Sequence, residues 1–91
     1  MNRLFDALAH PTRRKVLSLL AKRSRPAGEL AACFDVAAPT MSRHFAILKD
    51  ADLIREERRG TSRVYSLNMS LTEEVMAAVM TLLRTEKEPK P

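Results

Sequence analysis

Residues 38–67 place a helical pattern directly before a basic hairpin pattern, and few folds accommodate both in that order. Met41, Phe45 and Leu48 recur at the spacing of one helix face, so we expect them to face a core. The other side of this helix carries short polar or cationic side chains, among them Thr40, Ser42 and Arg43. Such a face suits contacts outside the domain, and a DNA groove is one place where it could lie.

Two runs typical of β-strands follow, at residues 53–57 and 63–67, with residues 58–62 between them. Gly60 can take the positive φ that such a turn needs. Arg58, Arg59 and Arg63 make the tip of this hairpin cationic. A helix followed by a basic hairpin describes a winged helix.

The remaining segments predict a mainly α-helical fold with one small β-hairpin. Short helices are expected near residues 2–9, 11–21 and 27–34, with a turn of a helix-turn-helix at residues 35–37. After the hairpin, Ser70 to Glu73 resemble a capping box that opens a last helix ending near residue 85. We therefore expect one winged helix-turn-helix domain at residues 1–86 and a flexible tail at residues 87–91.

The positive charge of the chain is concentrated on residues 10–63, which include the expected helix-turn-helix and the hairpin. The whole sequence of 91 residues has a net charge of +5, whereas residues 10–63 alone carry twelve Lys or Arg and six Asp or Glu, a net charge of +6. Basic clusters at residues 13–15 and 22–25 flank the second helix. They could bind phosphates, and a solvated basic face is an equally good interpretation.

Other features of the sequence indicate where in the cell the protein is found. The sequence has no apolar run near the ~18 residues of a membrane span, and its first residues lack the apolar run of a signal peptide. We expect a cytoplasmic protein without direct membrane insertion. A single cysteine, Cys33, cannot form an internal disulfide, which fits a reducing compartment.

The first and last helices carry more apolar surface than a small core is expected to cover. This pattern suggests a homodimer formed by these two helices of each copy, although both could instead close over their own domain. The residues expected at the dimer interface are Leu4, Phe5, Leu8, Leu71, Val75, Val79, Leu82 and Leu83.

Four phrases of the sequence, at residues 7–17, 28–31, 39–48 and 59–68, resemble the ArsR family of bacterial winged-helix repressors. The resemblance spans nearly the whole chain in the family's order and spacing. Within the family it is greatest to the sporulation-delay autorepressor branch, in which no metal site is evident. It implies a homodimeric, autoregulatory repressor that binds double-stranded DNA at an inverted-repeat operator.

The resemblance also assigns roles to residues of the helix at 38–51. The family's base-reading positions fall on Pro39, Thr40, Ser42 and Arg43, and His44 lies beside them. Arg43 is the best candidate to read sequence, because its guanidinium can bond to both O6 and N7 of guanine. Pro39 could equally be a helix starter, and His44 could donate to a phosphate or have a packing role. The hairpin adds Arg58, Arg59, Thr61, Ser62 and Arg63 as candidate DNA contacts.

The sequence departs from the metal-sensing members of the family. Where they have Cys-x-Cys in the third helix, this chain has Ala31 and Cys33, and its last helix has no His. Too few ligands remain for a soft metal, so we expect no metal site, no cofactor and a buried Cys33. His10 replaces the usual Asp before Pro11, and Ala37 replaces the usual Ser or Thr cap of the recognition helix.

Three other functions compete with a DNA-binding repressor. An enzyme is the weakest, since the sequence has no phosphate-binding glycine loop and no pair of carboxylates in a pocket-forming pattern. A thiol- or metal-released sensor of the same fold would need a site that the sequence does not reveal. A protein-interaction module would use the terminal helices and bind DNA weakly. A protein partner that sequesters the dimer is also compatible with these helices.

Overall fold

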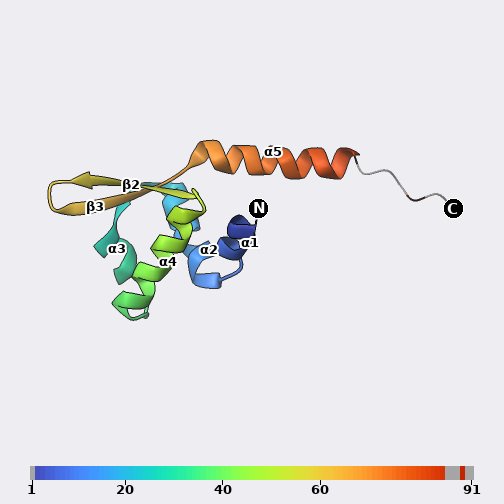
Figure 1. Cartoon of the computed structure of the whole chain (residues 1–91). Coiled ribbons are helices and arrows are strands. Elements are labelled where there is room, and N and C mark those ends of the chain that lie inside the picture. Colours follow the sequence, from blue (N-terminus) through green and yellow to red (C-terminus); the bar gives the residue numbers. More distant parts are fainter. Residues whose placement is uncertain (1, 86–88, 90–91) are drawn as a thin grey trace.

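The structure, a computed structural model, describes residues 2–85 and residue 89. Along the chain its elements are α1 (Asn2–Leu8), α2 (Pro11–Lys22), β1 (Arg25–Pro26), α3 (Ala27–Ala32), α4 (Ala38–Asp50), β2 (Ile54–Arg59), β3 (Ser62–Leu67) and α5 (Met69–Thr85). This order confirms the predicted winged helix-turn-helix, mainly helical with one hairpin (Figure 1). Apart from residue 89, the predicted tail lies outside the described residues. No helix in the described part of the chain is long and apolar enough to cross a bilayer.

The core lies where α2, α3 and α4 meet the base of the hairpin. Phe45 of α4 stacks against Tyr65 of β3, with ring centroids 4.9 Å apart. Burying these side chains is the main source of stability for so small a domain. The side chains at the centre of this core are Val16, Leu20, Leu30, Met41, Phe45, Leu48, Leu53, Ile54 and Tyr65.

The sheet has three antiparallel strands in the order β1-β3-β2, one more than predicted. In β1, Arg25 pairs with Tyr65 and Pro26 with Val64. A two-residue strand that contains proline has no alternating pattern to recognise, and proline is tolerated there because β1 is an edge strand. Gly60 has a φ of +61° in the turn between β2 and β3, which is the role predicted for it.

The starts of α2, α4 and α5 differ in their capping, and two of the three have a side-chain cap. Nδ1 of His10 accepts a hydrogen bond from the backbone N–H of Thr12 at 3.1 Å. The imidazole therefore caps the N-terminus of α2 in place of the Asp that is usual in the family. Ala37, as the sequence predicted, gives α4 no side-chain cap. The predicted capping box at residues 70–73 is wrong, because α5 begins at Met69. Asn68 caps it instead, and its Oδ1 accepts from the backbone N–H of Leu71 at 3.3 Å.

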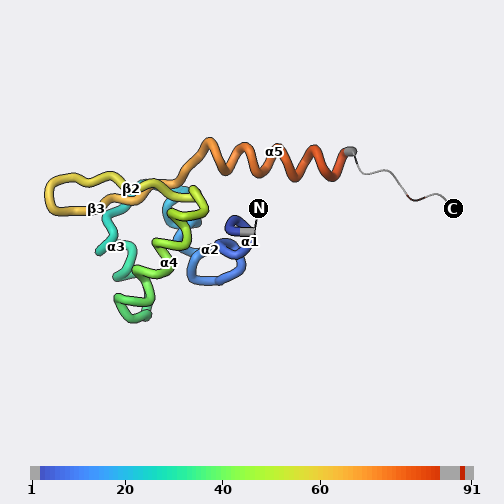
Figure 2. The backbone as a smooth tube through the Cα atoms, in the orientation of Figure 1, coloured from blue at the N-terminus to red at the C-terminus, as the bar shows by residue number. Residues whose placement is uncertain are grey.

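Helix α5 runs past the base of the hairpin and then projects beyond the other helices (Figures 1 and 2). Its first turns pack on the domain through the half-buried Leu71. Further along, its large apolar side chains are exposed: Met76 by 64%, Val79 by 48% and Leu83 by 67%. Such a surface is unusual for an isolated domain and is typical of an interface.

Candidate nucleic-acid interface

Helix α4 divides into a buried face and an exposed face. Met41, His44, Phe45 and Leu48 are buried, and they recur at i, i+3, i+4 and i+7. The predicted base-reading side chains lie on the other face and are exposed: Pro39, Thr40, Ser42 and Arg43. The side chain of Arg43 forms no hydrogen bond or ion pair with any described residue, so its guanidinium is free to bind a ligand outside the domain.

The hairpin of β2 and β3, which we call the wing, presents its predicted contacts to solvent. Arg59 forms an ion pair with Glu57 at 3.1 Å, and Arg63 lies 3.8 Å from Glu56. Such exposed pairs are weak and can exchange for a phosphate. The exposed side chains at or beside the tip are Arg58, Arg59, Thr61, Ser62 and Arg63.

Glu56 connects the wing to α4. Its Oε2 lies 3.5 Å from Nζ of Lys49, and its Oε1 faces Arg63. Desolvation raises the pKa of Glu56, but a hydrogen bond with Tyr65 and the charges of Lys49 and Arg63 outweigh it, so this pKa is lowered overall. Glu56 is therefore an ionised group that joins the wing to the last turn of α4.

Arg13 and Arg14, two residues of the basic cluster at residues 13–15, are used differently from either predicted interpretation. Arg13 is buried, and its guanidinium donates to the backbone carbonyl oxygens of Ala7 at 2.9 Å and Asp6 at 2.7 Å. Arg14 donates to the carbonyl oxygen of Leu8 at 2.8 Å. These carbonyls belong to the last turn of α1, whose acceptors have no partner within that helix. Arg13 and Arg14 thus cap α1.

The second basic cluster is also partly engaged within the domain. Arg23 and Arg25 both pair with the carboxylate of Glu29, and the Arg25 contact is 3.4 Å long. The hydrogen bond and charge of Arg23 lower the pKa of Glu29 against a smaller effect of desolvation. Lys15 and Lys22 are exposed and form no ion pair with the described residues. These two lysines remain candidates for phosphate contacts.

His44 was predicted either to donate to a phosphate or to pack, and the structure places its side chain in a packed position. Its Nδ1 lies 3.2 Å from a guanidinium nitrogen of Arg13, and its ring centroid is 4.5 Å from that of His10. Burial lowers the pKa of His44, and the neighbouring His10, Arg13 and Arg43 lower it further. The spacing of His44 from Met41 on the buried face was the sequence signal for this position.

The prediction that Cys33 is buried is wrong, because Cys33 is exposed. Helix α3 ends at Ala32, so Cys33 caps its C-terminus at the surface, where its Sγ lies 3.4 Å from the carbonyl oxygen of Glu29. Among the described residues, no three His, Cys, Asp or Glu side chains cluster in a way that could hold a metal ion. Cys33 is thus an accessible thiol without a set of metal ligands around it.

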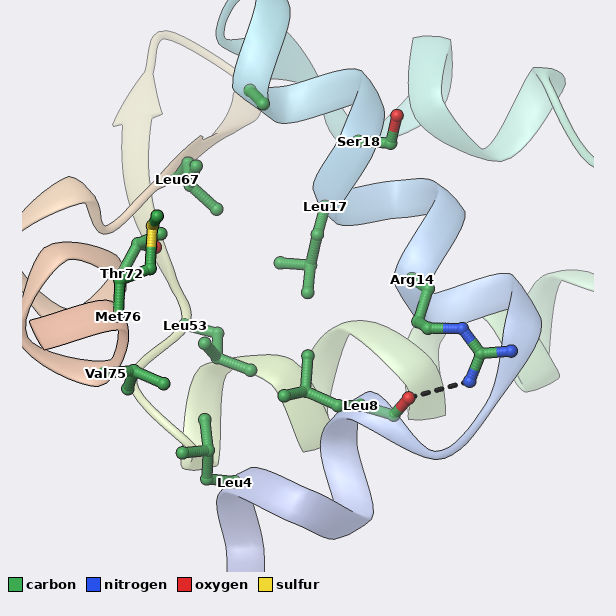
Figure 3. Close-up of a pocket in the computed structure, with 11 residues that line it drawn as sticks. Leu4, Leu8, Arg14, Leu17, Ser18, Leu53, Leu67, Thr72, Val75 and Met76 are labelled. Atoms are coloured by element: carbon green, nitrogen blue, oxygen red, sulfur yellow. Dashed lines mark hydrogen bonds between the residues drawn. The ribbon is translucent and has the colours of Figure 1, made fainter. Parts of the chain in front are cut away.

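The predicted dimer residues fall into three groups. Leu4, Leu8 and Val75 line an open apolar pocket of about 360 Å³ between α1, α2 and α5. In Figure 3, Leu4, Leu8 and Leu17 point into this pocket, while Arg14 lies at its edge and binds the carbonyl of Leu8. Leu71 packs on the core of its own domain. The others are exposed side chains of α1 or α5: Phe5, Val79, Leu82 and Leu83.

Known proteins resemble this chain in sequence and in structure. Residues 8–57 match a family described as a helix-turn-helix domain. The transcriptional repressor SdpR of Bacillus subtilis (strain 168) is 40% identical over 74 residues, which are 81% of this chain and 82% of SdpR. The arsenical resistance operon repressor of Staphylococcus xylosus is 32% identical over 73 residues, which cover 75% of this chain and 65% of that protein.

A solved structure agrees with these relatives. The ArsR family transcriptional regulator RHA00566 superposes with a TM-score of 0.77 at 33% identity, over 93% of this chain and 97% of that chain. Sequence and fold thus agree over almost the full length of the chain, beyond the helix-turn-helix alone. The chain belongs to the ArsR family of winged-helix transcriptional repressors.

Proposed function

We propose that this protein represses transcription by binding, as a homodimer, an inverted-repeat operator in front of its own gene. The observation that carries the proposal is that one domain presents both an exposed polar face near the start of α4 and an exposed basic wing, which Glu56 joins to Lys49 in the last turn of α4. The 40% identity to SdpR supports repression. A repressor of this kind acts on the chromosome, so the proposal places the protein in the cytoplasm.

On DNA, α4 is the recognition helix and enters the major groove. Its exposed face carries Thr40 and Ser42, which are short enough to let the helix approach the bases, and Arg43, which reads guanine with two hydrogen bonds. Pro39 is exposed at the start of the helix, where it can contact a thymine methyl group. The wing brings Arg58 and its neighbours to a phosphate or to the adjacent minor groove.

The homodimer is formed by α1 and α5 of each copy. The exposed apolar side chains of α5 and the pocket between α1, α2 and α5 support this choice of surface. A two-fold axis at this surface gives two recognition helices related by the same axis. Their half-sites must then be centred about ten base pairs apart, or a multiple of it, on one side of the duplex.

The direct test is to sequence DNA fragments that the purified protein retains and to footprint the DNA upstream of its own gene. A two-fold symmetric protected site in that region is the expected result. Arg43→Ala should weaken protection of this site by roughly 1–3 kcal/mol and binding to random DNA much less. Arg84→Ala, which removes a charge near the end of α5, is the matched control. Protection of one asymmetric half-site, or no sequence preference among the retained fragments, would contradict the proposal.

A further inference from the structure

A buried histidine on the recognition helix contacts the only other histidine of the sequence. His44 lies on the inner face of α4, and its Nδ1 is 3.2 Å from a nitrogen of the Arg13 guanidinium. The same guanidinium donates to the carbonyl oxygens of Asp6 and Ala7 in α1. Arg13, from α2, therefore joins α1 and α4 through one rigid group.

The chemistry of this contact fixes the protonation of His44. A guanidinium has only N–H donors, so the 3.2 Å contact is a hydrogen bond only if Nδ1 of His44 carries no proton. Nδ1 of His10 is likewise an acceptor, for the backbone N–H of Thr12 at 3.1 Å. Both imidazoles thus use Nδ1 as an acceptor, and a proton on Nδ1 of His44 would point at an N–H of Arg13.

Burial and the neighbouring cationic or titratable side chains oppose a positive charge on His44. Helix α2 contributes Arg13, its N-cap residue is His10, and α4 itself contributes Arg43. From α1 come two backbone carbonyls, which are occupied by Arg13. Among the described residues, no carboxylate forms an ion pair with His44 or Arg13. Burial and these cations together lower the pKa of His44.

We propose that His44 is a positioning residue, which holds the recognition helix on α1 and α2 through Arg13 only while its imidazole is neutral, so that acidification loosens α4 and weakens DNA binding. This inference rests on the proposed function, in which α4 reads the operator. The sign follows from linkage. The unfolded or loosened chain takes up a proton at pH values just below 6.5 more readily than the packed state, so stability is complete above that pH and is lost as the pH falls.

The direction of the effect separates this role from the other role considered for His44. A histidine that contacts a phosphate gains a positive charge on acidification and strengthens DNA binding. A histidine that positions α4 does the opposite. One measurement, the change in affinity between about pH 8 and about pH 5.5, therefore distinguishes the two roles.

The experiment measures the affinity of the dimer for the footprinted operator duplex by fluorescence anisotropy across this pH range at constant ionic strength. The wild-type protein is expected to bind several-fold more weakly at the acidic end, because the packed position of His44 disfavours the protonated imidazole in both subunits. In His44→Asn, the side-chain oxygen occupies the place of Nδ1 and cannot be protonated in this range. The loss on acidification should therefore disappear, whatever the absolute affinity of the variant.

His10→Asn is the matched control, because asparagine keeps the cap on Thr12 and removes the neighbouring imidazole. It should retain an acid-dependent loss. If the loss disappeared in His10→Asn and persisted in His44→Asn, the proposal would be overturned in favour of His10. Tighter wild-type binding at acidic pH, or a flat profile, would also overturn it while leaving the proposed function intact. A wild-type protein without specific binding at pH 8 would overturn both proposals.

A second measurement does not depend on how the variants fold. Nitrogen-15 NMR of the wild-type imidazoles reports which ring nitrogen carries the proton. We expect His44 to be protonated on Nε2 alone at neutral pH and to titrate below 6.5. A protonated Nδ1 at neutral pH would show that the bond from Arg13 does not exist and would overturn the proposal.

Discussion

Arg13 and Arg14 are adjacent, have the same charge and bind the same end of α1, yet we expect their replacement by alanine to have very different effects. The Arg13 guanidinium is buried and makes three hydrogen bonds of 2.7 to 3.2 Å, to two carbonyl oxygens and to His44. Arg14 is exposed and makes one, of 2.8 Å, to Leu8. Arg13→Ala and Arg14→Ala remove the same charge, so the difference between them measures the effect of burial and hydrogen bonding.

The loss of stability depends on how many hydrogen-bond acceptors each substitution leaves without a donor. A hydrogen bond to a charged group contributes about 1.5–3 kcal/mol, but the desolvation of a buried cation offsets a large part of three such bonds. Arg13→Ala also leaves buried acceptors without a donor, so we expect a loss of roughly 2–4 kcal/mol in the free energy of unfolding. Arg14→Ala loses one solvent-exposed bond and should cost less than about 1 kcal/mol.

Urea denaturation followed by circular dichroism measures both losses, at equal protein concentration because a dimer is stabilised by mass action. For a domain of this size the melting temperatures of the two variants should differ by more than about 5 °C. Arg13→Lys keeps the charge but cannot place donors on three separate acceptors, so its stability should fall between wild type and Arg13→Ala. Losses that agree within about 0.5 kcal/mol for the two alanine variants would refute the role assigned to Arg13.

The other predictions concern DNA, assembly and release. Arg43→Ala should weaken binding to the operator by roughly 1–3 kcal/mol and binding to random DNA much less, whereas Arg59→Ala should weaken binding to both alike and lower the slope of log affinity against log salt concentration by about one unit. Anisotropy titrations at several salt concentrations measure both effects. Identical specificity and salt dependence of the two variants would contradict the division of roles. Leu83→Asp should shift sedimentation towards the monomer at micromolar protein, and an unchanged dimer would place the interface elsewhere. Zinc, cadmium or arsenite should leave operator affinity unchanged, as should Cys33→Ser; a several-fold loosening by metal that Cys33→Ser removes would establish a sensor.

The pattern of apolar residues was sufficient to predict most of the fold. Met41, Phe45 and Leu48 were assigned to the core from their spacing, and all are buried. The burial predicted for Cys33 rested on its lack of metal-ligand partners and not on this spacing, and it was wrong because α3 ends before Cys33, which caps the helix at the surface. Strand β1 was missed because its two residues form hydrogen bonds only through the distant β3. The periodicity of apolar residues predicts regular helices and strands, but it does not predict where a helix ends or which short segment joins the edge of a sheet.

The candidate site was harder to predict, because charge in the sequence does not reveal which cations are already bonded. Of the twelve basic residues counted at residues 10–63, Arg13 and Arg14 bind carbonyls of α1, and Arg23 and Arg25 share Glu29. These bonds depend on contacts between elements, which a linear pattern cannot show. Lys49, Arg59 and Arg63 form exposed ion pairs, and Arg55 bonds to Asn68. The basic side chains of this range without a hydrogen bond or ion pair to the described residues are Lys15, Lys22, Arg43 and Arg58, so less charge is free for DNA than the sequence suggests.

This distribution has a consequence for the way salt acts on the protein. Each phosphate contact adds about 0.9 to the slope of log affinity against log salt concentration, and buried or internally paired arginines add little. The slope should then report mainly on the wing and on exposed lysines such as Lys15, while Arg13 acts on DNA only through the position of α4. Recognition and stability thus use neighbouring, chemically identical side chains for separate purposes. Burial decides between the two, because Arg13 uses three of its five N–H donors inside the domain and its guanidinium is buried, where a phosphate cannot reach the other two.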